Sequence, residues 1–429
     1  MSWPPHPDRA AIETAQVEQL RSLVAELIPA NKFYTRKLQA AGVGFDVASL
    51  ADFSARFPFT TKAEIVADQL AQPPFGTNLT YPADRYTRFH QTSGTSGSPL
   101  RWLDTPESWD AMTESWMEIL RAAGVGAGDR VLFAFSFGPF IGFWLAFEAA
   151  ARLGCLCLPG GGLGSAARLH MMRDNAVNVL CCTPTYAIRL GEVAAEEIMD
   201  RRGLKLKTII VAGEPGGSIP ATRARVESLW PGARVFDHHG MTEVGPVSYE
   251  CPAGPGVLHI LESAYFAEVI DPVTTKAAPS GELVLTTLGR TGSPLLRYRT
   301  GDLVTRHLSP ATAACTCGRH EFALVGGILG RVDDMIIVRG VNVYPGAVEE
   351  IIRGCGGIAE YRVQVGERQA LTELRVEIEP ADEGGDPAEL ASQVERAFAT
   401  ALALRVTVTT VAAGTLPRFE MKARRWVKS

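Results

Sequence analysis

The spacing of apolar residues indicates that the first 80 or so residues are mainly helical. Between Ala10 and Leu27, apolar side chains recur every three or four positions, which is typical of one face of an amphipathic helix. Thr61 and Glu64 have the spacing of a capping box and predict the start of a further helix. We therefore expect a helical N-terminal segment.

From Arg130 onward, short apolar runs alternate with helical segments. The runs are 131–135, 155–158, 177–182 and 208–212, and helical patterns lie between them. Such alternation is typical of βαβ units and predicts a mainly parallel sheet. After about Val257 the runs become shorter and alternate in polarity, as in 267–271 and 281–288, which predicts an antiparallel sheet or a small barrel.

A third pattern begins near Asp333. It predicts strands at 335–338, 361–365 and 374–378 and helices at 345–353 and 386–404. The expected fold class is therefore α/β, with a large N-terminal body of mainly parallel α/β sheets plus a small β subdomain. This body spans residues 1–332, and a small α+β C-terminal domain spans residues 333–429.

Charge and composition exclude several classes of protein. The 42 Lys and Arg and 47 Asp and Glu residues give a net charge of −5, without the basic excess expected of a nucleic-acid-binding protein. The chain has no uninterrupted apolar run of about 18 residues, the length that a membrane-spanning helix needs. The first residues lack the order of a signal peptide, and eight cysteines are too few for a disulfide scaffold. We expect a cytoplasmic location with reduced thiols.

The segment from Thr92 to Ser98 is the most informative local motif. It combines two glycines with four hydroxyl residues besides Ser98, and successive N–H groups in such a loop can bind phosphate oxygens. The Gly-Lys-Ser/Thr ending of a Walker A loop is missing. A surface linker has a similar composition, so the loop needs support from the rest of the chain.

That support comes from motifs further along, at 240–243, 298–302, 330–334, 339–345 and 416–422. Their order and spacing resemble the adenylate-forming superfamily of acyl- and aryl-CoA synthetases, luciferases and peptide-synthetase adenylation domains. Within it, the chain is most similar to the phenylacetate–CoA ligase branch, from about Phe59 to Lys422. The resemblance implies ATP, Mg²⁺ and CoA as cofactors or co-substrates.

The resemblance also implies which residues bind the nucleotide. Asp302 matches the carboxylate that binds the ribose hydroxyls, Arg331 a ribose and phosphate contact, and His239 the position of an aromatic side chain stacked on adenine. Where the family commonly has a loop lysine, this chain has Ser98. The other nucleotide-binding positions implied are Thr92, Ser93, Gly94, Thr95, Ser96 and Gly97 at the phosphates, and Gly213, Glu214, Pro215, Gly240, Met241 and Thr242 near adenine.

Two residues match catalytic positions of the family. Lys422 corresponds to the C-terminal lysine that contacts the α-phosphate and the acyl carboxylate, and a flexible ammonium can neutralise developing charge. Glu243 corresponds to the magnesium-associated glutamate, a hard oxygen ligand. In the family the small domain rotates between the two half-reactions. Asp333 occupies the hinge position, and Gly340 occupies the position that the pantetheine arm passes.

A set of cysteines and a histidine predicts a metal site. Cys251, His259, Cys315 and Cys317 supply three thiols and an imidazole, a plausible tetrahedral set for structural zinc, and similar sets occur in some relatives of the branch. The Cys-x-Cys pair is tighter than the usual C-x₂-C spacing. The alternative is that these side chains are small buried hydrophobes.

The acid substrate is expected to bind among aromatic side chains. Phe135, Phe137, Phe140 and Tyr186, together with the loop before Gly240, offer flat apolar walls for an aryl acid, although each aromatic also fits an ordinary core. The leading hypothesis is an aryl acid–CoA ligase that forms an acyl-adenylate and then a thioester. Alternatives are transfer to a carrier protein or an amine, activation of a non-carboxylate anion such as nitrite, and a non-catalytic nucleotide-binding relative. The expected partners are small molecules, with a carrier protein and a homodimer left open.

Overall fold

The computed structural model describes residues 6–92, 99–197, 204–307, 314–339, 341–368, 371–381, 386–419 and 422–428, with the backbone alone at 367, 368, 371 and 428. None of the helices in this part of the chain combines the length and the apolarity of a membrane span.

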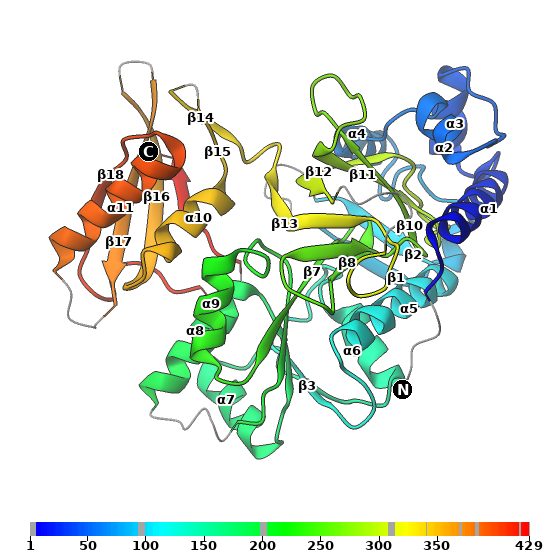
Figure 1. Cartoon of the computed structure of the whole chain (residues 1–429). Helices are drawn as coiled ribbons and strands as arrows, with labels where there is room; N and C mark the ends of the chain where they lie inside the picture. Colours follow the sequence, from blue (N-terminus) through cyan, green and yellow to red (C-terminus); the bar gives the residue numbers. More distant parts are fainter. Residues whose placement is uncertain are drawn as a thin grey trace.

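One long mixed sheet forms the body of the molecule (Figure 1). Its strands are β3 (Arg130–Phe133), β4 (Leu156–Pro159), β5 (Val179–Cys182), β6 (Thr208–Val211), β7 (Arg234–Met241), β8 (Gly245–Glu250), β9 (Val257–Ile260), β10 (Tyr265–Ile270), β11 (Ser280–Thr287), β12 (Tyr298–Arg306) and β13 (Ala323–Arg331). Among the described residues their order is β10-β11-β12-β13-β9-β8-β7-β6-β5-β3-β4.

The sheet has a parallel half and an antiparallel half that meet at β7. Strands β4, β3, β5, β6 and β7 pair in parallel, as the βαβ pattern predicted. From β7 through β8 and β9 the pairing is antiparallel. Of the two alternatives for the region after Val257, the structure therefore has the antiparallel sheet. This sheet continues the parallel one because β7 belongs to both.

Helices cover both faces of the parallel half. Successive residues of a strand point to opposite faces, and in β3 Val131 and Phe133 belong to one core cluster while Leu132 belongs to another. The helices α5 (Pro106–Ala122) and α6 (Trp144–Arg152) pack on the first face. The helices α7 (Ser165–Asp174), α8 (Pro184–Glu196) and α9 (Pro220–Leu229) pack on the second.

The N-terminal segment is helical as predicted. The capping box is present, because the Thr61 side chain accepts from the backbone of Glu64 and the Glu64 side chain accepts from the backbone of Thr61. The first helix buries Leu20, Leu23 and Val24 against the first core cluster. The elements are α1 (Arg9–Leu27), α2 (Lys32–Ala40), α3 (Leu50–Arg56), α4 (Lys62–Ala71), the short η1 (Ala83–Arg85), and the hairpin of β1 (Arg88–Gln91) and β2 (Arg101–Asp104).

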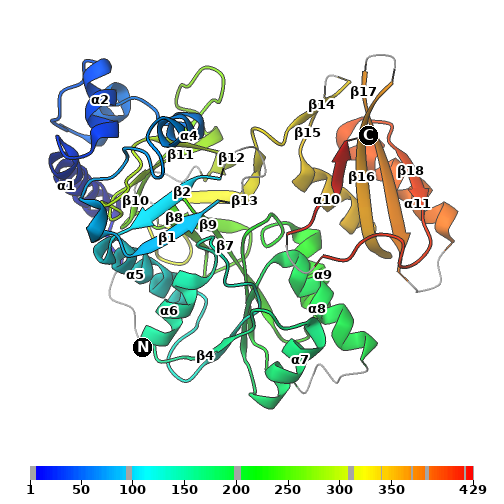
Figure 2. The same ribbon diagram turned by 180° about the vertical axis from the view of Figure 1, so that it is seen from behind.

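The C-terminal part forms an α+β unit beside the body (Figure 2). It comprises β14 (Ile336–Val338), β15 (Val341–Val343), α10 (Pro345–Gly354), β16 (Ile358–Arg368), β17 (Leu371–Pro380), α11 (Pro387–Leu402), β18 (Thr407–Thr410) and β19 (Trp426–Lys428). Among the described residues, its main sheet has the order β18-β17-β16-β19. Val348 and Phe398 lie in a core cluster built from this unit. The expected boundary at residue 333 falls between β13 and β14.

Candidate active site

The carboxyl ends of β6 and β7 carry two of the predicted loops. Open α/β sheets bind ligands at this edge. The loop after β6 rests against β7, because Ser218 donates a hydrogen bond to Asp237 at 2.5 Å. A Cβ atom at Gly217 would lie 2.4 Å from the Asp237 carboxyl carbon, so this close approach requires glycine. The structure thus brings the segments containing Gly213 and His239 to one edge of the sheet.

Asp302 is held by two of the predicted nucleotide residues. His239 Nε2 lies 3.0 Å from one carboxylate oxygen of Asp302, and Arg331 Nη1 lies 3.1 Å from the other. Asp302 and Arg331 are also direct partners in the β12–β13 ladder. Asp302 is buried, at 4% exposure. The three side chains that the sequence placed in separate motifs therefore form one cluster, with the imidazole bound to the carboxylate.

Glu243 is buried next to this cluster and is oriented by two residues that the sequence did not assign to the site. The Tyr298 hydroxyl donates to Glu243 Oε1 at 3.0 Å. Arg290 forms a two-point ion pair with buried Asp104, at 2.6 and 2.7 Å, and donates to the Thr242 carbonyl at 2.9 Å. These contacts fix both the carboxylate and the backbone before it. Tyr298 is the first residue of the motif 298–302 that ends at Asp302, and its place in that motif could have marked it as a site residue.

Lys422 enters the same site from the C-terminal unit. A Cβ atom at Gly213 would lie 3.5 Å from Lys422 Cε, so the lysine stem runs along that loop. The residue keeps an open side to solvent. Desolvation of the ammonium group by the surrounding protein nevertheless lowers its pKa, opposed by the negative charges of Glu214, Glu243 and Asp302 and reinforced by the positive charge of Arg331. A cation from one unit thus faces carboxylates of the other.

The Gly-rich loop is described only at its base. The Thr92 hydroxyl accepts from the Leu100 backbone at 3.0 Å, and the Thr92 N–H donates to the Leu100 carbonyl at 2.9 Å. Thr92 and Leu100 are thus hydrogen-bonded to each other at the base of the loop. The predicted residues outside the described part of the chain are Ser93, Gly94, Thr95, Ser96, Gly97 and Gly340. Asp333 is exposed beyond β13 and pairs with Arg331 at 2.8 Å.

Three of the four predicted aromatic residues lie in one segment, and the fourth does not join them. The Phe135 and Phe137 rings are 4.6 Å apart and partly exposed, and Phe140 of the same segment is also partly exposed. Tyr186 is 1% exposed and belongs to the core cluster on the other face of the sheet. Its hydroxyl lies 3.1 Å from that of Ser165. The expectation that Tyr186 shares a substrate wall with the phenylalanines is wrong for this structure.

The predicted metal ligands converge outside the nucleotide site. One ligand atom from each of Cys251, His259, Cys315 and Cys317 lies within 4.8 Å of the others. The Cys251 and Cys315 sulfurs are 3.7 Å apart, and the Cys317 sulfur is 3.4 Å from His259 Nε2. Zinc–sulfur bonds of about 2.3 Å in a tetrahedron place two thiolates about 3.8 Å apart. The set therefore fits Zn²⁺.

The imidazole of this group has the protonation state that a metal ligand needs. Burial lowers the pKa of His259 to about 4, and the charge of Arg319 adds to the effect. The ring is therefore neutral near pH 7. Since all four positions of a tetrahedron would be filled by protein atoms, this is the arrangement of a structural rather than a catalytic site.

Comparison with known proteins identifies the class. The model of the AMP-binding enzyme C-terminal domain matches residues 340–429. The phenylacetate-coenzyme A ligase of Pseudomonas putida is 31% identical over 96% of this chain and 93% of that protein. The structure of 2-hydroxyisobutyryl-CoA ligase in the postadenylation state superposes with a TM-score of 0.92 at 29% identity, covering 99% of this chain and 91% of the other. In the thioesterification state with CoA, the same ligase superposes at 0.73 with 30% identity, over 100% and 94% of the two chains.

The fold is thus that of an adenylate-forming enzyme. More particularly, the chain belongs to the phenylacetate–CoA ligase family and is an AMP-forming acid–thiol ligase. The predicted superfamily, branch and fold class are confirmed.

Proposed function

We propose that this enzyme activates an aryl carboxylic acid, similar to phenylacetate or benzoate, as an acyl-adenylate and transfers the acyl group to the thiol of CoA. The observation that carries the proposal is the position of Lys422, whose side chain lies along the Gly213 loop of the body and is influenced by the negative charges of Glu214, Glu243 and Asp302. The curated relatives named phenylacetate–CoA ligase support the substrate class.

In the first half-reaction, a carboxylate oxygen attacks the α-phosphorus of ATP and the bond to the β-phosphate breaks, releasing pyrophosphate. Two anions must meet, so charge neutralisation and orientation dominate the barrier. We assign the neutralising charge to Lys422. Asp302 accepts hydrogen bonds from the ribose hydroxyls, and Arg331 supports it. Glu243 would hold Mg²⁺, which when bound offsets the charge of the phosphates.

In the second half-reaction, the thiolate sulfur of CoA attacks the acyl carbon, and the bond to AMP breaks. We assign the remaining predicted nucleotide positions to their sequence-based roles, namely Thr92 through Gly97 at the phosphates and Gly213, Pro215, Gly240, Met241 and Thr242 near adenine. Asp333 is the proposed hinge between the domains 1–332 and 333–429. Gly340 is the proposed contact of the pantetheine arm.

The aromatic segment after β3 supports an aryl substrate. Phe135 and Phe137 keep part of their rings exposed while packing on each other, and Phe143 lies 5.0 Å from Phe135. Partly exposed flat rings offer stacking area to another ring. We propose that these phenylalanines and Phe140 line the acid pocket.

We further propose that Cys251, His259, Cys315 and Cys317 hold a structural Zn²⁺ ion. Such an ion would join the end of β8 to β9 and to the segment before β13. A cytoplasmic location and a homodimer stay predictions.

Product analysis tests the proposed function. The enzyme is incubated with ATP, Mg²⁺ and CoA and with a panel of phenylacetate, benzoates, cinnamates and 2-hydroxyisobutyrate, and products are identified by mass. An aryl-CoA thioester with AMP is the expected result. Thioester from 2-hydroxyisobutyrate alone overturns the aryl assignment. If acid-dependent AMP release yields a product with a carrier protein or an amine and none with CoA, the assignment of CoA as the acceptor is wrong. If AMP release depends on nitrite, the assignment of a carboxylic acid as the substrate is wrong.

A further inference from the structure

Glu214 lies in the loop after β6 of the N-terminal body, and one of its carboxylate oxygens is bound to the start of α8. Its Oε1 accepts from the Thr185 backbone N–H at 2.9 Å, in the first turn of α8. The N–H groups of a first helical turn lack partners within the helix, and the helix dipole favours a carboxylate there. The other oxygen is thereby held in a defined position at the end of the loop that follows β6.

That second oxygen contacts the segment that carries Lys422. The backbone N–H of Ala423 donates to Glu214 Oε2 at 2.9 Å, across 209 positions of sequence. The preceding residue of the loop, Gly213, lies against the Lys422 side chain. Two adjacent residues of the body therefore contact both the stem of the lysine and the backbone immediately after it.

Apart from a donation by Arg425 Nη1 to Thr185 Oγ1 of the body at 3.4 Å, the side-chain anchors of the Lys422 segment lie within its own unit. On the upstream side, Arg418 forms a two-point ion pair with Glu379 of β17, at 2.5 and 3.2 Å. On the downstream side, Arg425 does the same with Glu360 of β16, at 2.7 and 3.2 Å. These ion pairs fix the segment to its own unit. The contact of Ala423 with Glu214 and the weaker contact of Arg425 with Thr185 dock it on the body.

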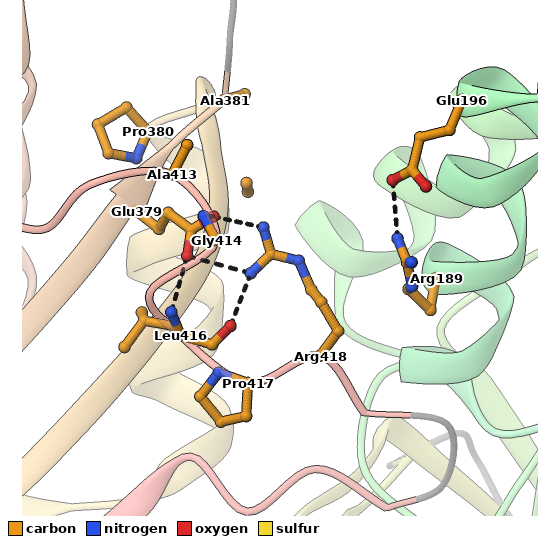
Figure 3. Close-up of a pocket in the computed structure, with 11 residues that line it drawn as sticks. Arg189, Glu196, Glu379, Pro380, Ala381, Ala413, Gly414, Leu416, Pro417 and Arg418 are labelled. Atoms are coloured by element: carbon orange, nitrogen blue, oxygen red, sulfur yellow. Dashed lines mark hydrogen bonds and ion pairs between the residues drawn. The ribbon is translucent and has the colours of Figure 1, made fainter.

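A cavity of about 470 Å³ separates the upstream anchor from the body (Figure 3). Figure 3 shows Glu379 and Arg418 on one side and the Arg189–Glu196 ion pair of α8 on the other. Each of these two pairs joins residues of a single unit, whereas Glu214 has one carboxylate oxygen on α8 and the other on the backbone next to Lys422.

The two comparison structures of one ligase differ in how well they superpose on this chain. The TM-score is 0.92 for the postadenylation state of 2-hydroxyisobutyryl-CoA ligase and 0.73 for its thioesterification state. The relative placement of the two units here is thus nearer to that of the postadenylation state.

We propose that Glu214 is a positioning residue for adenylation: it docks the backbone at Ala423 and thereby aligns Lys422 in the first half-reaction, but takes no part in the second. The proposal rests on the proposed function. It differs from the sequence-based role of Glu214 near adenine, since the partners of its two carboxylate oxygens are backbone N–H groups of α8 and of the residue after Lys422.

The two half-reactions, measured separately, test this role. In Glu214→Ala, we expect acid-dependent ATP–pyrophosphate exchange to fall about 10- to 100-fold, the range for losing a hydrogen bond to a charged group. Thioester formation from added acyl-adenylate and CoA should stay within about twofold of wild type. Glu214→Gln keeps one oxygen as an acceptor, so its exchange rate should lie between those of the wild type and Glu214→Ala. In a Lys422→Ala background, Glu214→Ala should cause little further loss.

Glu196→Ala is the matched control, because it removes a carboxylate of the same body that lines the cavity between the two units and pairs with Arg189 of α8. Equal losses in both half-reactions, or an undiminished effect without Lys422, would overturn the proposal. A second readout needs no substrate: backbone hydrogen exchange at Ala423 should be faster in Glu214→Ala and unchanged in Glu196→Ala. Unchanged exchange in both overturns the docking contact, whereas a wild-type enzyme inactive on every acid overturns the proposed function alone.

Discussion

The hydroxyl of Tyr298 donates a hydrogen bond to Oε1 of Glu243 at 3.0 Å, and both side chains are buried. One carboxylate oxygen thus accepts from a donor on β12, whereas Glu243 lies in the turn between β7 and β8. The negative charge of Glu243 in turn raises the pKa of Tyr298, after the larger effect of burial, so the phenol stays protonated and continues to donate. This pairing fixes the direction in which the carboxylate can meet a metal ion.

Removing the phenol should weaken the use of Mg²⁺. In Tyr298→Phe, we expect the Mg²⁺ concentration needed for half-maximal ATP–pyrophosphate exchange to rise about 10-fold, because outer partners of a metal ligand typically contribute 10- to 100-fold. Tyr265→Phe is the control, since that hydroxyl donates to the Val244 carbonyl at 3.1 Å rather than to a carboxylate. Identical Mg²⁺ dependence in the two variants would contradict the assignment of Glu243.

The lowered pKa of Lys422 should appear in the alkaline limb of adenylation. Lys422 is charged below its pKa and neutral above it, so adenylation should decline as the pH rises through a value below the usual 10.5. In Lys422→Arg the cation persists to higher pH, so the residual exchange activity should lose this limb. Exchange rates of both enzymes from pH 7 to 10.5 supply the measurement, and parallel profiles would argue against a role for this charge.

Zinc should be present and should stabilise the fold. Protein purified without added metal is expected to contain about one zinc ion per chain, because one potential ligand atom from each of four residues lies within 4.8 Å of the others. Cys317→Ser should lose the metal and lower the melting temperature by roughly 5 °C or more. Cys155→Ser, which changes a partly buried thiol outside the cluster, should retain the zinc. A zinc content near zero in the wild type rejects the site.

The buried carboxyl of Glu321 should make stability depend on pH. Burial raises its pKa to about 8, and the charge of Glu118 contributes. Because the folded pKa exceeds the unfolded one, the stabilisation by the protonated form is lost as the pH rises toward 8. Glu321→Gln should therefore gain melting temperature relative to wild type from pH 5 to pH 8, with no further gain above about pH 8.5. A constant difference across this range would contradict the shifted pKa.

The local spacing of apolar residues was enough to predict most of the helices and strands. The helix expected at Ala10–Leu27 begins at Arg9 in the structure and ends at Leu27, because its apolar period is long and regular. Apolar runs located the parallel strands to within a few residues. The grouping of Cys251, His259, Cys315 and Cys317 was also expected from sequence, and the structure brings the four side chains together; that they bind a metal stays a prediction.

Long-range partners were beyond the reach of such patterns. The contact of Glu214 with Ala423 and that of Arg290 with Asp104 join residues far apart in the chain, and nothing in the spacing of either partner marks the other. Tyr186 follows a strand end that faces the site, but it lies in the first turn of α8, whose buried face directs the ring into the core. Residue type and position along a strand do not decide which face a following helix buries.

Acid-dependent exchange of labelled pyrophosphate into ATP, in the absence of CoA, isolates the step on which the whole proposal depends. The wild-type enzyme should catalyse exchange with an aryl acid and Mg²⁺, and Lys422→Ala should reduce the rate by at least about 100-fold while leaving the melting temperature unchanged. Exchange that is undetectable with every acid tested, or that proceeds equally well without Lys422, would contradict adenylation by this site.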